Sequence, residues 1–140
     1  MALSQDVVDA HIAEWEGQLQ SPYYPHRRQW PSRLFHHTPI ENAARIMLDG
    51  NLRSRADPKN SRAKDVAAGG VIDNRLHAHS FVRLYFRPRT PTQYHIEGIG
   101  KIGECKYGDS THTPVLVMFL LDVRKVLTRD GVEFAIVTCN

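Results

Sequence analysis

The sequence of 140 residues predicts a single α+β domain. Apolar residues recur every three or four positions in residues 4–20, and residues 38–50 carry start and stop signals of a helix. Short apolar stretches at 81–86, 115–121 and 132–138 are typical of strands. A chain of this length buries enough surface to fold without disulfides or structural metals.

Cysteine usage and the character of the N-terminus predict a cytoplasmic protein. Cys105 and Cys139 form neither a disulfide framework nor a CxxC zinc pair, which indicates a reducing compartment. Acidic residues interrupt the N-terminal segment, so it lacks the apolar core of a signal peptide. The longest apolar run, 115–121, is too short to span a bilayer, and we expect no membrane partner.

Positive charge is concentrated in residues 26–89. This stretch holds 13 of the 18 lysines and arginines against five acids, a net charge of +8, whereas the remainder of the chain carries −5. Such a region favours a polyanionic partner, either nucleic acid or a cofactor with a pyrophosphate. Charge alone does not choose between the two.

The N-terminal third is predicted to contain a helix and an aromatic connection. Ser4 is the expected N-cap of the helix at 4–20, whose acidic polar face argues against a membrane-surface helix. One face of that helix carries Val8, Ile12, Trp15 and Leu19. Residues 21–31 then interleave aromatic and cationic side chains, which stack bases and hold phosphates in other proteins. For so short a segment, packing of its aromatics on the core is the favoured interpretation.

A short strand at 34–36 is predicted to lead into a helix with a capping box. Thr38 is the expected N-cap, Pro39 the first helical residue and Glu41 the third, with Gly50 at the C-terminal end. The spacing predicts a core-facing set and an outward set: Ile40, Ala43, Ala44 and Met47 inward, and Glu41, Asn42, Arg45 and Asp49 outward. Histidines delivered to a helix start favour an anion or polar-ligand site, unless Thr38 only caps and His37 is an ordinary surface residue.

Residues 54–70 are predicted to be a long loop with one helical turn at 61–67. The loop carries Lys59, Arg62 and Lys64, and long ordered loops are often functional. A mobile basic excursion is the alternative.

The stretch from 76 to 94 combines a predicted buried strand, 81–86, with a basic turn. Arg83, Arg87 and Arg89 would project to the same side of an extended chain and form a cationic face, or else simply lie on a solvated surface. His77 and His79 form an HxH pair, but no further ligands follow at a recognisable spacing, so we predict no metal site.

The C-terminal part is predicted to hold a glycine-rich loop at 94–110 and two core strands. The glycine spacing matches neither a Rossmann nor a P-loop fingerprint. A helical turn or hairpin-like link at 122–131 is expected to join the strands 115–121 and 132–138. No Ser-His-Asp order or paired nucleophile and base stands out.

Five segments together resemble the DarT family of NAD-dependent ADP-ribosyltransferase toxins, which act on single-stranded DNA in toxin–antitoxin and phage-defence systems. The segments are FHHT at 35–38, IEN at 40–42, DGNL at 49–52, HSFVRLYF at 79–86 and PRTPTQY at 88–94. The resemblance divides the chain into an N-terminal helix and aromatic linker, 1–33, and a transferase domain, 34–140. It implies an ADP-ribosyltransferase-like fold, a split mixed β core with flanking helices, that grips NAD in a cleft.

The resemblance also implies site residues. Arg62 is the best candidate for the family's catalytic arginine, with Arg55 and Arg75 as alternatives. The expected NAD-binding residues are His36, His37, Thr38, Arg53, Arg62 and Tyr85. The expected DNA-binding residues are Arg83, Arg87, Arg89 and Tyr94. Thymidine is the expected target, and an antitoxin protein is a possible partner.

The family's catalytic glutamate is expected to lie beyond residue 140, so the chain is predicted to be a fragment or a shortened form. Glu133 is the nearest carboxylate, but its alternation with apolar neighbours favours an outward strand residue, and Glu97 and Glu104 are weaker candidates. A catalytically inactive NAD- or nucleic-acid-binding module on the same scaffold is therefore the alternative function. A third hypothesis is a transferase with a protein or RNA acceptor.

Overall fold

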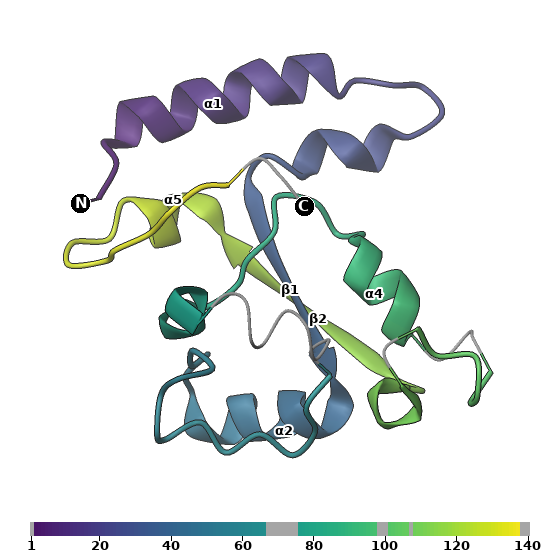
Figure 1. Cartoon of the computed structure of the whole chain (residues 1–140). Helices are drawn as coiled ribbons and strands as arrows, with labels where there is room; N and C mark the ends of the chain where they lie inside the picture. Colours follow the sequence, from purple (N-terminus) through teal and green to yellow (C-terminus); the bar gives the residue numbers. More distant parts are fainter. Residues whose placement is uncertain (1, 67–75, 98–100, 107, 138–140) are drawn as a thin grey trace. The chain divides into compact units, whose positions relative to one another are not determined.

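The computed structural model describes residues 2–66, 76–97, 101–106 and 108–137. Helices and strands are mixed along the chain, which confirms the predicted α+β class (Figure 1). The α-helices and strands are α1 (Gln5–Gln18), β1 (Arg33–Pro39), α2 (Ile40–Asp49), α4 (Pro91–Ile96), β2 (Leu116–Asp122) and α5 (Val123–Leu127). The 3-10 helices are η1 (Pro25–Gln29), η2 (Leu76–Ser80) and η3 (Asp109–Thr111).

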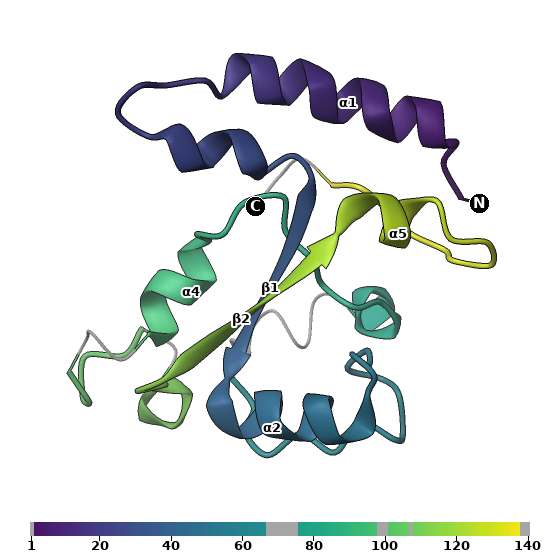
Figure 2. The same ribbon diagram turned by 180° about the vertical axis from the view of Figure 1, so that it is seen from behind.

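Strands β1 and β2 pair as an antiparallel two-stranded sheet, and both views show them side by side (Figures 1 and 2). The Ile40 amide donates to the Val115 carbonyl at 3.1 Å, and the Val123 amide donates to the Ser32 carbonyl at 3.2 Å. One partner rises in number as the other falls, which is the antiparallel order.

The chain divides into two compact units. Unit 1 comprises Met1–Phe35, Tyr85–Pro88 and Leu120–Asn140, and unit 2 comprises His36–Leu84 and Arg89–Phe119. Each strand of the sheet therefore gives residues to both units.

In unit 1, α1 packs against α5 and η1. Ser4 caps α1 as predicted, because its hydroxyl accepts from the Val7 amide. Val8 and Ile12 are buried, but Trp15 remains 41% exposed, so the predicted apolar face covers less of the helix than its spacing implied. The ion pair of Arg124 Nε with Asp9 Oδ1, at 2.5 Å, ties α5 to α1.

In unit 2, α2 follows β1 as predicted and ends at Gly50, whose φ of 68° is the left-handed conformation that glycine tolerates best. The predicted capping box is wrong. β1 continues through Pro39, which is the N-cap and makes no side-chain capping bond, so Thr38 is a buried strand residue.

The predicted faces of α2 are also wrong in part. Met47 is 70% exposed, and Ile40 and Ala44 are exposed as well, whereas Asn42 is buried beside Ala43. Glu41, Arg45 and Asp49 do face outward as expected.

The predicted buried strand at 81–86 is not formed. Tyr85 alone pairs there, in an antiparallel bridge with Phe35, and Phe86 is exposed. The preceding histidines, His77 and His79, lie in η2 rather than on an extended chain. Because no strand forms there, strand alternation does not place Arg83, Arg87 and Arg89 on one side of the chain.

Three further predictions can be compared with the described residues. The glycine-rich loop was expected to begin at residue 94, but residues 91–96 form α4. Thr90 caps this helix by accepting from the Gln93 amide, and Pro91 is its first residue. Residues 61–66 form no helical turn and 132–137 form no strand, while residue 67, 98–100, 107 and 138–140 lie outside the described part. The strand predicted at 115–121 and the helical turn after it are confirmed as β2 and α5.

Candidate functional site

The histidines of β1 are held neutral in the part of the strand that belongs to unit 2. His36 Nδ1 lies 3.0 Å from the Arg83 carbonyl, and because a carbonyl only accepts, Nδ1 carries the proton. Burial lowers the pKa of His36, partly offset by that hydrogen bond. Burial, with repulsion from His36, lowers the pKa of His37 from 6.5 to about 4. Neutral His36 therefore keeps a lone pair on Nε2 that can accept a hydrogen bond from a hydroxyl.

Asn42 links α2 to the described part of the predicted loop, residues 54–66, which we name the basic loop. Its Oδ1 accepts the amides of Ala63 and Lys64 at 2.8 and 3.0 Å, and its Nδ2 donates to the Lys64 carbonyl at 2.8 Å. Arg45 Nη1 donates to the Ser61 carbonyl at 2.5 Å. The side-chain amide thus replaces a backbone partner for residues 63–64 and fixes where the loop returns to the helix.

Sequence reasoning placed Asn42 on the outer face and so missed this role. An asparagine between Glu41 and Ala43 carries no pattern that distinguishes a loop anchor from a surface residue. Ala43, which the spacing placed inward, is buried next to it.

Two arginines at the start of the loop are occupied by carboxylates. Arg53 binds Asp49 through two hydrogen bonds, 2.6 and 3.0 Å, and Asp57 through a third at 3.1 Å. Hydrogen bonds to both carboxylates raise the pKa of Arg53, and Arg53 in turn lowers the pKa of Asp49. Arg55 forms a two-point ion pair with Asp65. These pairs brace the loop.

Arg62 differs from both, because its side chain is exposed and its Nη1 makes a long 3.4 Å contact with the Arg55 carbonyl. Across the described residues, its guanidinium has no ion pair. Lys64, two positions on, donates from Nζ to the His112 carbonyl. Arg75, the other alternative, lies outside the described residues.

The remaining candidates divide between the two units. Arg83, Arg89 and Tyr94 belong to unit 2 and are all exposed, Tyr94 on α4. Tyr85 and Arg87 belong to unit 1, where Tyr85 is half-buried by its bridge to Phe35 and Arg87 is exposed. Within unit 2, the structure brings His36 to the Arg83 backbone and Asn42 to the basic loop.

The carboxylates considered as catalytic candidates lie apart from any metal-binding cluster in the described residues. Glu133 is exposed in a segment without helix or strand, and Glu97 bridges to Thr113 in parallel orientation. No cluster of three or more His, Cys, Asp or Glu residues there could hold a metal ion. In the same part of the chain, no helix is both long and apolar enough to cross a bilayer.

The mixed α+β arrangement, in which β1 runs into α2 and Asn42 holds the basic loop against that helix, is consistent with an ADP-ribosyltransferase-like fold. Residues 35–140 match the family model DarT, described as ssDNA thymidine ADP-ribosyltransferase. The chain belongs to this family, which confirms the resemblance of its five segments. No curated protein and no solved structure matches the chain. At family level the activity is ADP-ribosylation of thymidine in single-stranded DNA with NAD as the substrate.

Proposed function

We propose that this chain transfers ADP-ribose from NAD to thymidine in single-stranded DNA and releases nicotinamide. The family match over residues 35–140 carries the proposal. We further propose that the chain is the toxin of a toxin–antitoxin or phage-defence system, that it acts in the cytoplasm, and that an antitoxin protein restrains it.

We assign NAD binding to the residues of β1 that belong to unit 2 and to the basic loop that carries Arg62. The pyrophosphate of NAD carries two negative charges, and an arginine without a carboxylate partner binds such a group through two hydrogen bonds. Arg62 meets that requirement, whereas Arg53 and Arg55 are held by aspartates. His36 and Thr38 supply neutral polar groups for ribose hydroxyls, with His37 between them. Arg53 then acts by bracing the loop, and Tyr85 by backing the strand through its bridge to Phe35.

The chemistry needs one bond broken and one formed at the same carbon. The bond between the ribose C1 and the nicotinamide nitrogen breaks, positive charge develops on the ribose, and an atom of the thymine base attacks C1 while its proton passes to solvent water. Arg62, as the catalytic residue, stabilises the negative charge that develops on the base. A carboxylate facing the ribose would stabilise its positive charge.

The DNA is assigned to the exposed cationic and aromatic side chains. Arg83, Arg87 and Arg89 are exposed and bind phosphates, and Tyr94 on α4 offers an exposed ring for stacking. The net charge of +8 in residues 26–89 attracts the strand over a longer range.

The test follows labelled ADP-ribose from NAD into oligonucleotides. A single-stranded oligomer containing thymidine should be modified, and the same oligomer with every thymidine replaced by cytidine should not. Calorimetric titration with NAD, without DNA, separates the alternative: binding without transfer identifies a catalytically inactive module. Label appearing in RNA or protein instead of DNA would contradict the assigned acceptor.

A further inference from the structure

Residues 20–30, which we name the aromatic-basic segment, precede the family match, so the match assigns them no role. Packing of the aromatics on the core, the interpretation favoured from the sequence, is wrong for two of them. Tyr23 is 85% exposed and Tyr24 is 48% exposed. The Tyr23 ring in particular gains little stabilising burial within the described structure and is available to a partner.

The segment is not a loose loop, because a cluster of rings orders it around Arg27. The Arg27 guanidinium carbon lies 4.1 Å from the centre of the Tyr24 ring and 5.6 Å from that of Trp30. The His26 ring meets Tyr24 edge-on, with centres 6.3 Å apart, and lies 6.1 Å from Trp30. These cation–π and ring contacts fix the 3-10 helix η1 and the residues beside Tyr23.

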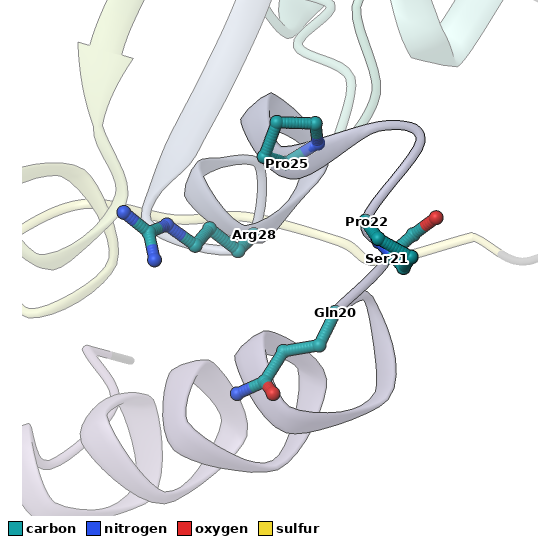
Figure 3. A pocket seen from close by; sticks show the side chains of 5 residues that line it. All are labelled: Gln20, Ser21, Pro22, Pro25 and Arg28. Atoms are coloured by element: carbon teal, nitrogen blue, oxygen red, sulfur yellow. The ribbon is translucent and has the colours of Figure 1, made fainter.

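A hollow of about 480 Å³ opens between the end of α1 and η1 (Figure 3). Its lining is Gln20, Ser21, Pro22, Pro25 and Arg28. In Figure 3 the Gln20 amide and the Arg28 guanidinium extend to the same side of this hollow. An amide that both donates and accepts, beside a guanidinium and rigid prolines, suits a flat polar base with its phosphate.

Charge favours a polyanion as the occupant. The sequence has no acid between Glu16 and Glu41, while Arg27, Arg28 and Arg33 fall in that interval. The exposed Tyr23 and Tyr24 rings are followed within the segment by the exposed Arg28, with the half-buried Arg27 stacked on Tyr24. Stacking rings beside a basic groove are the pattern by which proteins bind single strands.

We propose that the aromatic-basic segment binds single-stranded DNA at a second place, outside the transfer site. Tyr23 stacks on a base, and Arg28 binds a backbone phosphate at the hollow. The segment thereby raises the affinity of the chain for its DNA acceptor. The inference rests on the proposed function only in taking that acceptor as its ligand.

The first experiment measures binding of the full chain to a fluorescently labelled single-stranded oligonucleotide by anisotropy over a range of salt concentrations. Tyr23→Ala should weaken binding about five-fold or more, and Tyr23→Phe should not, because the ring and not the hydroxyl stacks. Arg28→Gln should reduce the slope of log K against log salt by about 0.7, the loss of one phosphate contact on a single strand.

Arg129→Gln is the matched control, since Arg129 is an equally exposed arginine of unit 1 outside the segment. It should leave affinity and salt slope close to those of the unmodified chain. Wild-type affinity and slope in both Tyr23→Ala and Arg28→Gln would overturn the inference, as would equal losses on a duplex of the same sequence, whose bases are not free to stack.

A transfer assay with the same variants separates the two proposals. Loss of binding in Tyr23→Ala from a chain that transfers no ADP-ribose would sustain this inference and count against the proposed activity. Transfer with an unchanged KM for DNA in both variants would sustain the activity and overturn this inference.

Discussion

Arg62 is the residue on which the proposed chemistry depends. The other arginines of this region are bound to aspartates: Arg53 pairs with two of them and Arg55 with one. The Arg62 guanidinium makes one long contact to a backbone carbonyl. A side chain so exposed contributes little to folding, so its replacement isolates its role toward a ligand.

Arg62→Gln should therefore weaken NAD binding or turnover by ten-fold or more and shift the melting temperature by less than about 2 °C. Calorimetry with NAD and thermal unfolding measure the two effects. Lys59→Gln, which removes another exposed cation of the same loop, is the control and should change neither. A large loss of stability in Arg62→Gln would mean that the residue is structural.

Asn42 should behave in the opposite way. Asn42→Ala removes three hydrogen bonds and leaves two amides and a carbonyl of residues 63–64 without their partner. The free energy of unfolding should fall by about 1–3 kcal/mol, and NAD should bind more weakly because the loop that carries Arg62 is loosened. Urea unfolding and NAD titration test this together. Unchanged stability would show that the loop is held by other contacts.

At the scale of the element, the end of α2 depends on Gly50. Its φ of 68° is strained for any residue with a β-carbon, although no atom lies within 4 Å of the place such a carbon would take. Gly50→Ala should thus cost about 1 kcal/mol through the backbone alone. Urea unfolding should show it, and Gly17→Ala, in the last turn of α1 with equal space around it, should stabilise instead. Equal effects of the two substitutions would contradict the assigned conformation.

The helices that local signals define were the predictable part of this fold. A serine cap and a stop glycine are read from a few adjacent residues, and α1 and the end of α2 agree with them, while α5 lies where a helical turn or hairpin-like link was expected. The strand predicted at 81–86 and the described part of the one predicted at 132–138, residues 132–137, do not form, because an apolar run forms a strand only where a partner strand exists. Tyr85 pairs with Phe35, whereas the residues on either side of Tyr85 pair with no strand in the described part of the chain.

The candidate site was predictable only in its residue types. The segment FHHT and the basic loop are visible in the sequence, but the choice among the loop arginines depends on which aspartates reach Arg53 and Arg55. Asp57 and Asp65 approach through the course of the loop, which no local pattern encodes. For the same reason the buried Asn42 was assigned to the wrong face.

At the scale of the whole molecule, buried histidines make stability depend on pH. The pKa of His37 falls from 6.5 to about 4 on folding, chiefly through burial, and that of His36 falls as well. Below pH 6.5, these two histidines therefore bind protons in the unfolded chain but stay largely neutral in the folded chain. The stabilisation is complete above pH 6.5 and is lost as the pH falls toward 4.

The free energy of unfolding should accordingly be about 2 kcal/mol lower at pH 5 than at pH 7. Urea denaturation at the two pH values measures the difference, and His37→Gln should remove the larger part of it. A difference unaltered by His37→Gln would assign the pH dependence to other groups.

The most direct test of the proposed function is transfer itself: labelled NAD, this chain and a single-stranded oligonucleotide containing one thymidine. We predict one ADP-ribose per oligonucleotide, absent when the thymidine is replaced and strongly reduced by Arg62→Gln. NAD binding without any transfer, under conditions in which Arg62→Gln lowers the NAD affinity, would contradict the assigned activity and leave a binding module on a DarT scaffold.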